Sequence, residues 1–160
     1  MQIRTIRGED DERLAKIIRK NLKDHQLDIP GTAYFDPELA HLTAFYQDSP
    51  RREYFVLVDY VDVVWGGVGV AEFIGKREYA ELQKLYLDDS VKGYGFSYPL
   101  VEKVYEFAKA AGYEKLYLET HHNLETAMHV YERTGFIRLQ EPVEGSQHGT
   151  MDAFYICDLK

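Results

Sequence analysis

Apolar side chains recur along the chain with two periods, and the changes of period mark the predicted elements. Leu14, Ile17, Ile18 and Leu22 are spaced as on one face of a helix, whereas residues 2–7 alternate as in a strand. Strands are predicted at 2–7, 52–60, 61–73, 79–87, 114–120, 136–140 and 150–159, and helices at 10–22, 36–46, 95–111 and 123–134. No repeat or linker interrupts this series, so residues 1–160 are predicted to form one domain.

The order of these elements is β-α-α-β-β-β-α-β-α-β-β, which predicts a mixed α/β (α+β) fold. The three consecutive strands in the middle have short connections and form an antiparallel meander. Asp36 is expected to cap the second helix, with Pro37 in its first turn. Asn123 is expected to cap the fourth helix, which Gly135 ends.

Composition narrows the function classes. The chain has 160 residues, of which 45% are hydrophobic and 29% charged, with a formal net charge of −8. An acidic chain does not favour nucleic acid, and no apolar run approaches the roughly 18–20 residues that span a membrane. One cysteine, Cys157, and an N-terminus without a secretory signal fit a cytoplasmic protein. The acidity favours a cationic substrate slightly, although solubility alone also explains it.

A glycine-containing loop lies between the strand at 79–87 and the helix at 95–111. It reads Lys92-Gly93-Tyr94-Gly95-Phe96-Ser97. Glycines allow a ligand to approach the backbone closely, and the N–H groups at a helix N-terminus bind anions, so phosphate is the first candidate ligand. A dinucleotide-binding unit is not favoured, because its glycine loop usually follows the first strand, and the P-loop pattern is absent.

The chain resembles the GNAT superfamily of N-acetyltransferases over essentially all of its length. The family motif [Q/R]-x-x-G-x-[G/A] is similar to residues 92–97, with Lys92 in place of Arg or Gln and Ser97 in place of Gly or Ala. A second motif, N-x-x-A-x-x-x-Y-x-x-x-G-F, is matched at every position by Asn123, Ala127, Tyr131, Gly135 and Phe136. The resemblance implies a seven-stranded, mostly antiparallel sheet that is splayed at its centre, with about four helices.

The resemblance also implies acetyl-CoA as co-substrate, without a metal. Its pyrophosphate would lie on the N–H groups of Lys92, Gly93, Tyr94, Gly95, Phe96 and Ser97. Its pantetheine arm would pair with the backbone of Leu85, Tyr86 and Leu87, and Asn123 would contact it. Alternatively, residues 85–87 belong to an ordinary core strand that binds no ligand.

Four residues are candidates for the chemistry of amine acetylation. The acceptor amine must lose a proton, and Glu81 resembles in position the base of several family members. Alternation places Glu81 on the same face of its strand as Leu85, whose N–H is the expected oxyanion donor. Glu119 is a second candidate base, and water alone is a third. Tyr131 matches the tyrosine that protonates the departing thiolate.

The sequence gives little information about the acceptor amine. Tyr34, Phe35, Glu119 and His148 are candidate substrate residues, with core packing or a solvated loop as the alternative. His121 and His122 are expected to line the acceptor entrance; adjacent histidines rarely bind one metal and no acidic partner recurs at ligand spacing, so no zinc site is expected.

The sequence therefore predicts acetyl transfer to a primary amine by direct attack. Two alternatives stay open: a non-catalytic acyl-CoA-binding sensor with the same fold, and an interaction module that has lost the cofactor. A homodimer is open by analogy with the superfamily.

Overall fold

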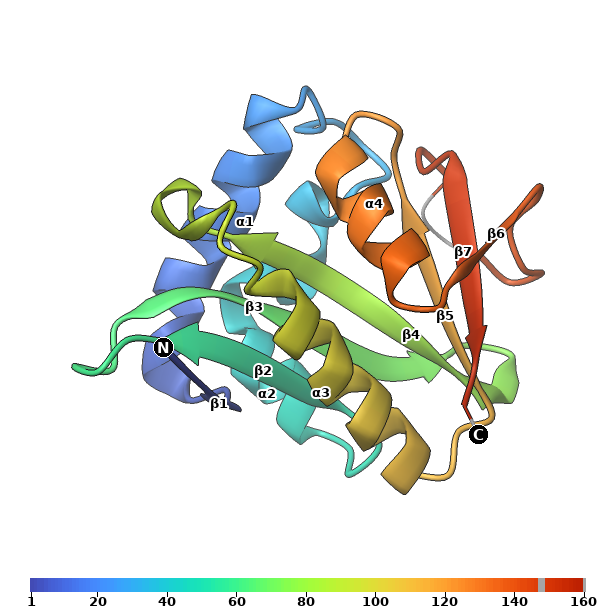
Figure 1. Cartoon of the computed structure of the whole chain (residues 1–160), viewed down its shortest axis with the longest axis horizontal. Coiled ribbons are helices and arrows are strands. Elements are labelled where there is room, and N and C mark those ends of the chain that lie inside the picture. Colours follow the sequence, from blue (N-terminus) through green and yellow to red (C-terminus); the bar gives the residue numbers. More distant parts are fainter. Residues whose placement is uncertain (147–148, 160) are drawn as a thin grey trace.

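The computed structural model describes residues 1–146 and 149–159 (Figure 1). Its strands are β1 (Gln2–Thr5), β2 (Glu53–Val58), β3 (Val64–Phe73), β4 (Lys76–Leu87), β5 (Lys115–Thr120), β6 (Ile137–Leu139) and β7 (Ala153–Asp158). Its α-helices are α1 (Asp11–Asp24), α2 (Leu42–Gln47), α3 (Ser97–Ala110) and α4 (Glu125–Arg133). Short 3₁₀ turns are η1 (Gly8–Asp10), η2 (Ala33–Phe35), η3 (Pro37–His41) and η4 (Asp89–Val91). The predicted element order is confirmed.

The seven strands form one mixed sheet in the order β1-β2-β3-β4-β5-β7-β6. Every neighbouring pair is antiparallel except β4 and β5, which are parallel. Helices α3 and α4 cover the front face in Figure 1, and α1 and α2 cover the back. Each layer has its own core, because Leu100 and Val104 of α3 pack on one face while Leu14 and Ile18 of α1 pack on the other.

The sheet is splayed where β4 meets β5. The ladder between them joins only Tyr79–Glu81 to Lys115–Tyr117. Beyond Glu81, β4 continues to Leu87 while β5 turns away, and the two strands diverge behind α4 in Figure 1. The predicted central splay is therefore confirmed, and it leaves one edge of residues 82–87 open to a ligand.

A β-bulge interrupts β4 in the splayed part. Gly69 pairs with Gln83 and Gly67 pairs with Tyr86, so β4 has one residue more than β3 over this span. Lys84 has a φ of +50° there, which is uncommon for a residue with a side chain. The predicted alternation from Glu81 to Leu85 is wrong as a result: Leu85 packs with the α3/α4 core, whereas Gln83, bonded to Glu81, reaches Tyr46 of the α1/α2 core.

Two predicted helix caps are also wrong. Asp36 precedes the 3₁₀ turn η3, and its carboxylate pairs with Lys84 at 2.9 Å instead of accepting a bond from the turn. The predicted second helix is therefore divided between η3 and α2. Asn123 lies one residue before the N-cap of α4, which is Leu124, and its side-chain amide donates to the carbonyl of His25 at 2.9 Å. In both cases a tertiary partner competes successfully with the local backbone.

Candidate active site

A cavity of about 830 Å³ lies at the splay between β4 and β5. It is lined by the loop before α3, by residues 81–87 of β4 and by the first turns of α4. Glu119 and Thr120 of β5 line it as well. Leu85 belongs to the α3/α4 face and Glu81 to the opposite one, so the cavity connects the two faces of the sheet.

The glycine loop is shaped as an anion site. Gly93 and Gly95 have φ values of +84° and +80°, a backbone conformation that favours glycine, and both line the cavity. A side chain on Gly93 would meet nothing within 4 Å. Helix α3 begins at Ser97 without a side-chain cap on its first N–H groups. Lys92 lines the cavity too, and its ammonium pairs with Asp89 at 2.7 Å. The uncapped N–H groups suit a phosphate group.

The open edge of β4 forms the middle of the cavity. Leu85, Tyr86 and Leu87 all line it, beyond the last ladder pair with β5. An extended, amide-containing ligand would find backbone partners along such an edge, as peptides do when they extend a sheet. The predicted pantetheine-binding residues thus lie where an extended ligand arm would pass.

Tyr131 of α4 faces the cavity from the side of the α3/α4 core. Its side chain lines the cavity, although the residue as a whole is only 5% exposed. Its ring is 5.8 Å from that of Phe136 and 6.0 Å from that of Tyr155, centroid to centroid. Burial raises the pKa of Tyr131, and Tyr86 and Tyr155 add to the effect. The phenol therefore remains a proton donor at neutral pH.

Two carboxylates, Glu81 and Glu119, line the cavity where β4 and β5 diverge. Glu81 accepts a bond from the Gln83 amide at 2.6 Å, and the carbonyl of that amide accepts from Tyr46 at 2.7 Å. One oxygen of Glu119 accepts from Tyr117 at 2.7 Å. Burial and the bond to Glu119 raise the pKa of Tyr117, and the charge of Glu81 adds to the effect.

The second oxygen of Glu119 is the more informative one. Oε1 is buried and has no hydrogen-bond partner among residues 1–146 and 149–159. A buried acceptor oxygen without a donor is unfavourable, and a bound amine or water would satisfy it. Glu119 lines the cavity, which makes it the carboxylate of the site with hydrogen-bonding capacity left unused among the described residues.

Sequence reasoning missed several residues that line the cavity, among them Asn21, His25, Lys84, Tyr98 and Arg133. Asn21 could have been found, because it is a polar residue within the apolar face of the first helix. Its amide donates to the Leu87 carbonyl at 2.8 Å and so joins α1 to the end of β4. Tyr98 and Arg133 carry no comparable signal in the sequence.

Some predicted site residues lie outside the cavity. Tyr94 is 75% exposed and Phe35 is 58% exposed, and neither contributes to the described cavity walls. Tyr34 is partly buried against the α1/α2 core, in agreement with the packing alternative. Its neighbour Ala33 lines the cavity instead. His148 lies outside the described residues.

A second cavity of about 290 Å³ adjoins the first on the α1/α2 side. The two share Glu81, Gln83 and Lys84 of β4. The charged residues around the smaller cavity are Asp36, Glu38, Glu72, Glu81, Arg52 and Lys84, which gives four carboxylates against two cations. Its charge balance is therefore negative.

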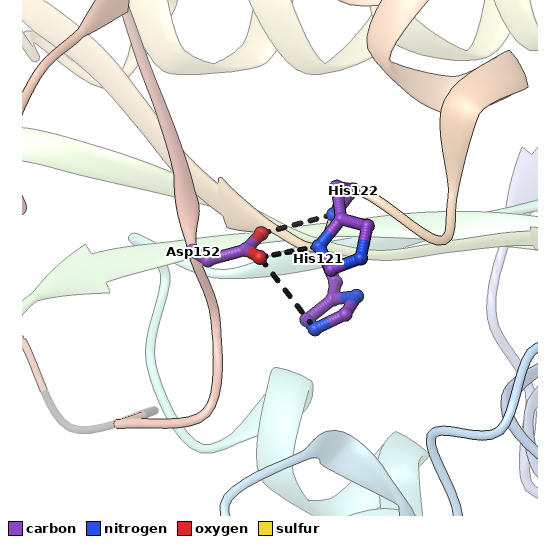
Figure 2. Close-up of side chains that lie close together, drawn as sticks. All are labelled: His121, His122 and Asp152. Atoms are coloured by element: carbon purple, nitrogen blue, oxygen red, sulfur yellow. Dashed lines mark hydrogen bonds and ion pairs between the residues drawn. The ribbon is translucent and has the colours of Figure 1, made fainter.

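A cluster of His121, His122 and Asp152 lies near the end of β5 (Figure 2). Asp152 precedes β7, and its carboxylate accepts bonds from the backbone N–H of His122 at 2.9 Å and from the ring of His122 at 2.5 Å. Asp152 lies 30 residues after His122 in the sequence, and the pairing of β5 with β7 brings the two together. The local sequence pattern therefore shows no acidic partner for the histidines. Neither histidine lines the two cavities described.

Hydrogen bonds assign the protons of this cluster. The backbone N–H of Asn123 donates to Nδ1 of His121 at 3.1 Å, so the proton of that ring lies on Nε2, which is 3.7 Å from the Asp152 carboxylate. The ring nitrogen of His122 that faces Asp152 carries a proton as well. A metal needs unprotonated ring nitrogens, so this arrangement favours a hydrogen-bonded link between β7 and the loop after β5.

Comparison with known proteins identifies the family and the fold. The acetyltransferase (GNAT) family pattern matches residues 19–136. The chain is 32% identical over 136 residues to YjgM, an uncharacterized N-acetyltransferase of Escherichia coli (strain K12), covering 84% of this chain and 80% of that relative. The chain belongs to the GNAT family of acetyltransferases.

Two solved structures agree with this assignment. A GNAT-family acetyltransferase of Staphylococcus aureus Mu50 superposes with a TM-score of 0.87 over 99% of both chains, at 19% identity. A Salmonella typhimurium protein that was solved with its cofactor acetyl-CoA superposes with a TM-score of 0.77, at 18% identity, over 100% of this chain and 94% of that one. The GNAT fold of the present chain is thus established.

Within the described residues, no helix is both long and apolar enough to cross a membrane.

Proposed function

We propose that this GNAT protein transfers the acetyl group of acetyl-CoA to a primary amine of a cationic acceptor. One observation carries the proposal: a single cavity joins the glycine loop at residues 92–97, the open edge of β4 and a carboxylate with an unsatisfied buried oxygen. Acetyl-CoA supplies the activated acetyl group, and the rest of the chemistry depends on residues of this chain.

Backbone groups would bind and orient acetyl-CoA. The N–H groups around Gly93 and Gly95 hold the pyrophosphate, with the N-terminus of α3 behind them. Residues 85–87 pair with the amides of the pantetheine arm, and Asn123 keeps its loop against His25. The N–H of Leu85 stabilises negative charge that develops on the acetyl carbonyl oxygen.

Proton transfer would involve residues on both faces of the sheet. The acceptor approaches from the α1/α2 face, where Glu81 or Glu119 removes a proton from its ammonium group, directly or through water. Glu119 gains support from its orphan oxygen, and Glu81 from its position beside the splay. Tyr131 lies on the other face, where its neutral phenol would donate a hydrogen bond to the departing thiolate.

The charge of the residues around the site indicates the class of acceptor. The adjoining cavity has four carboxylates and two cations, and the whole chain has a formal net charge of −8. An ammonium-bearing acceptor is attracted by such a wall, and a carboxylate-bearing one is repelled. A small amine with a second positive charge suits the two joined cavities best.

The direct test follows CoA thiol release from acetyl-CoA across a panel of amines. The panel contains diamines and monoamines of equal chain length together with amino acids, and reactions without acceptor serve as the control. We expect acceptor-dependent release, with the highest kcat/KM for the diamines. Binding of acetyl-CoA without release for any amine would support a non-catalytic acyl-CoA sensor, and absence of binding would support an interaction module.

A further inference from the structure

Lys84 is unusual for a residue in the middle of a strand. Its φ is +50°, a backbone conformation that residues with side chains adopt rarely, and its side chain is only 4% exposed. A strained backbone and a buried ammonium are each unfavourable, so their surroundings must hold both in place. Glycine would relieve the strain at this position, which suggests that the lysine side chain itself is needed.

The ammonium is held by two carboxylates from the segment before α2. Lys84 Nζ lies 2.9 Å from Asp36 and 3.4 Å from Glu38. Burial by itself lowers the pKa of Lys84, but Asp36 and Glu38 outweigh burial and raise it. Lys84 therefore remains an ammonium at neutral pH, and it serves as the centre of a three-residue ionic clamp.

The backbone of Lys84 is held from the other side of β3. The hydroxyl of Tyr54, a buried residue of β2, donates to the Lys84 carbonyl at 2.9 Å. Its ring crosses β3 at Gly67, where a β-carbon would lie only 2.5 Å from the ring. The bulge is thus held by its carbonyl and its side chain at once.

This clamp joins two parts of the site. Lys84 lines both cavities, and it lies next to Leu85 on the open edge of β4. Asp36 and Glu38 belong to the wall of the smaller cavity, on the face from which the acceptor would approach. The acceptor wall and the acetyl-binding strand are therefore connected through one side chain.

We propose that Lys84 is a positioning residue for acetyl transfer: its buried ammonium, bound by Asp36 and Glu38, holds the acceptor wall in register with the bulge that presents Leu85. The inference rests on the proposed function, since it assigns Leu85 to the acetyl group and the Asp36–Glu38 wall to the acceptor. A misplacement of about 1 Å can lower an enzymatic rate by roughly a hundredfold, so loss of the clamp should affect turnover strongly.

The test compares Lys84→Met with Lys103→Met. The control removes an exposed lysine of α3 whose ammonium is also 3.4 Å from a glutamate, Glu106. Hydrogen exchange measured by mass spectrometry should become faster in residues 32–41 of the Lys84 variant only. At saturating acetyl-CoA, kcat/KM for the acceptor should fall by at least tenfold in the Lys84 variant and stay unchanged in the control.

A second pair of variants separates positioning from folding. Glu38→Gln should reproduce part of the loss, and Lys84→Met combined with Glu38→Gln should lose no more than Lys84→Met alone, because both act on one clamp. If Lys84→Met does not fold, Asp36→Asn tests the same clamp with the lysine stem in place.

Unchanged exchange in residues 32–41 would overturn the proposal whether or not an acceptor is known. Faster exchange with unchanged kcat/KM would overturn it too, since Lys84 would then be only structural. If the parent protein itself transfers no acetyl group, the proposed function fails first; that result is recognised in the parent before any variant is examined, and the positioning role then fails with it.

Discussion

Two glycines of this chain allow the anion site to be tested with an internal control. Gly93 has a φ of +84° and Gly112 a φ of +87°, and at both positions an added β-carbon would meet nothing within 4 Å. Gly93 lines the cavity, whereas Gly112 follows the end of α3 and does not. Replacing each with alanine introduces the same backbone strain at two places, only one of which can affect acetyl-CoA.

The effect on stability should be equal in the two variants. A left-handed conformation is unfavourable for an L-residue by about 1–2 kcal/mol. A change of 1 kcal/mol shifts the melting temperature of a chain of this size by about 2–4 °C. Both Gly93→Ala and Gly112→Ala should therefore melt roughly 2–8 °C below the parent protein when no ligand is present.

The effect on binding should differ. In Gly93→Ala, either a methyl group stands at the cavity surface or the loop relaxes and turns its N–H groups away, and we expect Kd for acetyl-CoA to rise at least tenfold. At a ligand concentration of 100 times the parent Kd, binding adds about 2.7 kcal/mol to the parent protein and to Gly112→Ala. The same concentration adds about 1.4 kcal/mol to Gly93→Ala.

Thermal melting with and without acetyl-CoA measures both effects in one experiment. The expected ligand-induced rise is roughly 5–11 °C for the parent and Gly112→Ala, and about half as large for Gly93→Ala. Equal rises in the two alanine variants would refute the reasoning, because the cavity-lining glycine would then have no contact with the ligand.

Three further results are expected. Tyr131→Phe should lower kcat with little change in the Kd of acetyl-CoA, as measured by single-turnover kinetics and calorimetry; an unchanged kcat would remove the phenol from the mechanism. A carboxylate base works only when ionised, so activity is lost as the pH falls, and whichever of Glu81→Gln and Glu119→Gln abolishes this acidic limb identifies the base. Asp152→Asn should lower the melting temperature by at most about 4 °C, because the pair is partly exposed, whereas equimolar zinc should leave it unchanged; a zinc-dependent rise that needs Asp152 would contradict the proton assignment at His121 and His122.

The stability contribution of Asp152 has a defined pH dependence. Burial raises the pKa of this carboxylate, but its bonds to His122 outweigh burial, and the pKa lies below its ordinary value of 3.8. A carboxyl group with a lowered pKa in the folded state stabilises the fold above the unfolded pKa, and the contribution is lost as the pH falls through the folded value. The melting difference between parent and Asp152→Asn should therefore be present above the ordinary pKa of the carboxyl group and disappear as the pH falls through its lowered folded-state pKa.

The parts of the site that sequence predicts are those that depend on local geometry. The Gly93–Gly95 loop is readable because a positive φ needs glycine, and the order of elements follows from apolar periodicity. The same local reasoning predicts that Asp36 and Asn123 cap helices, and this prediction is wrong. Each side chain had a partner elsewhere in the chain, Lys84 or His25, that no local pattern reveals.

The bulge in β4 shows that a contact between distant segments can still leave a signal in the sequence. Gly67 and Gly69 of β3 lie opposite the bulge, and a β-carbon there would lie 2.5 Å from the Tyr54 ring or 2.4 Å from the Tyr46 hydroxyl. These glycines let the two tyrosines cross β3 and bond the Lys84 carbonyl and the Gln83 amide on β4. Glycines inside a strand indicate close approach by another group, and here that group is the support for the strand on which acetyl transfer would take place.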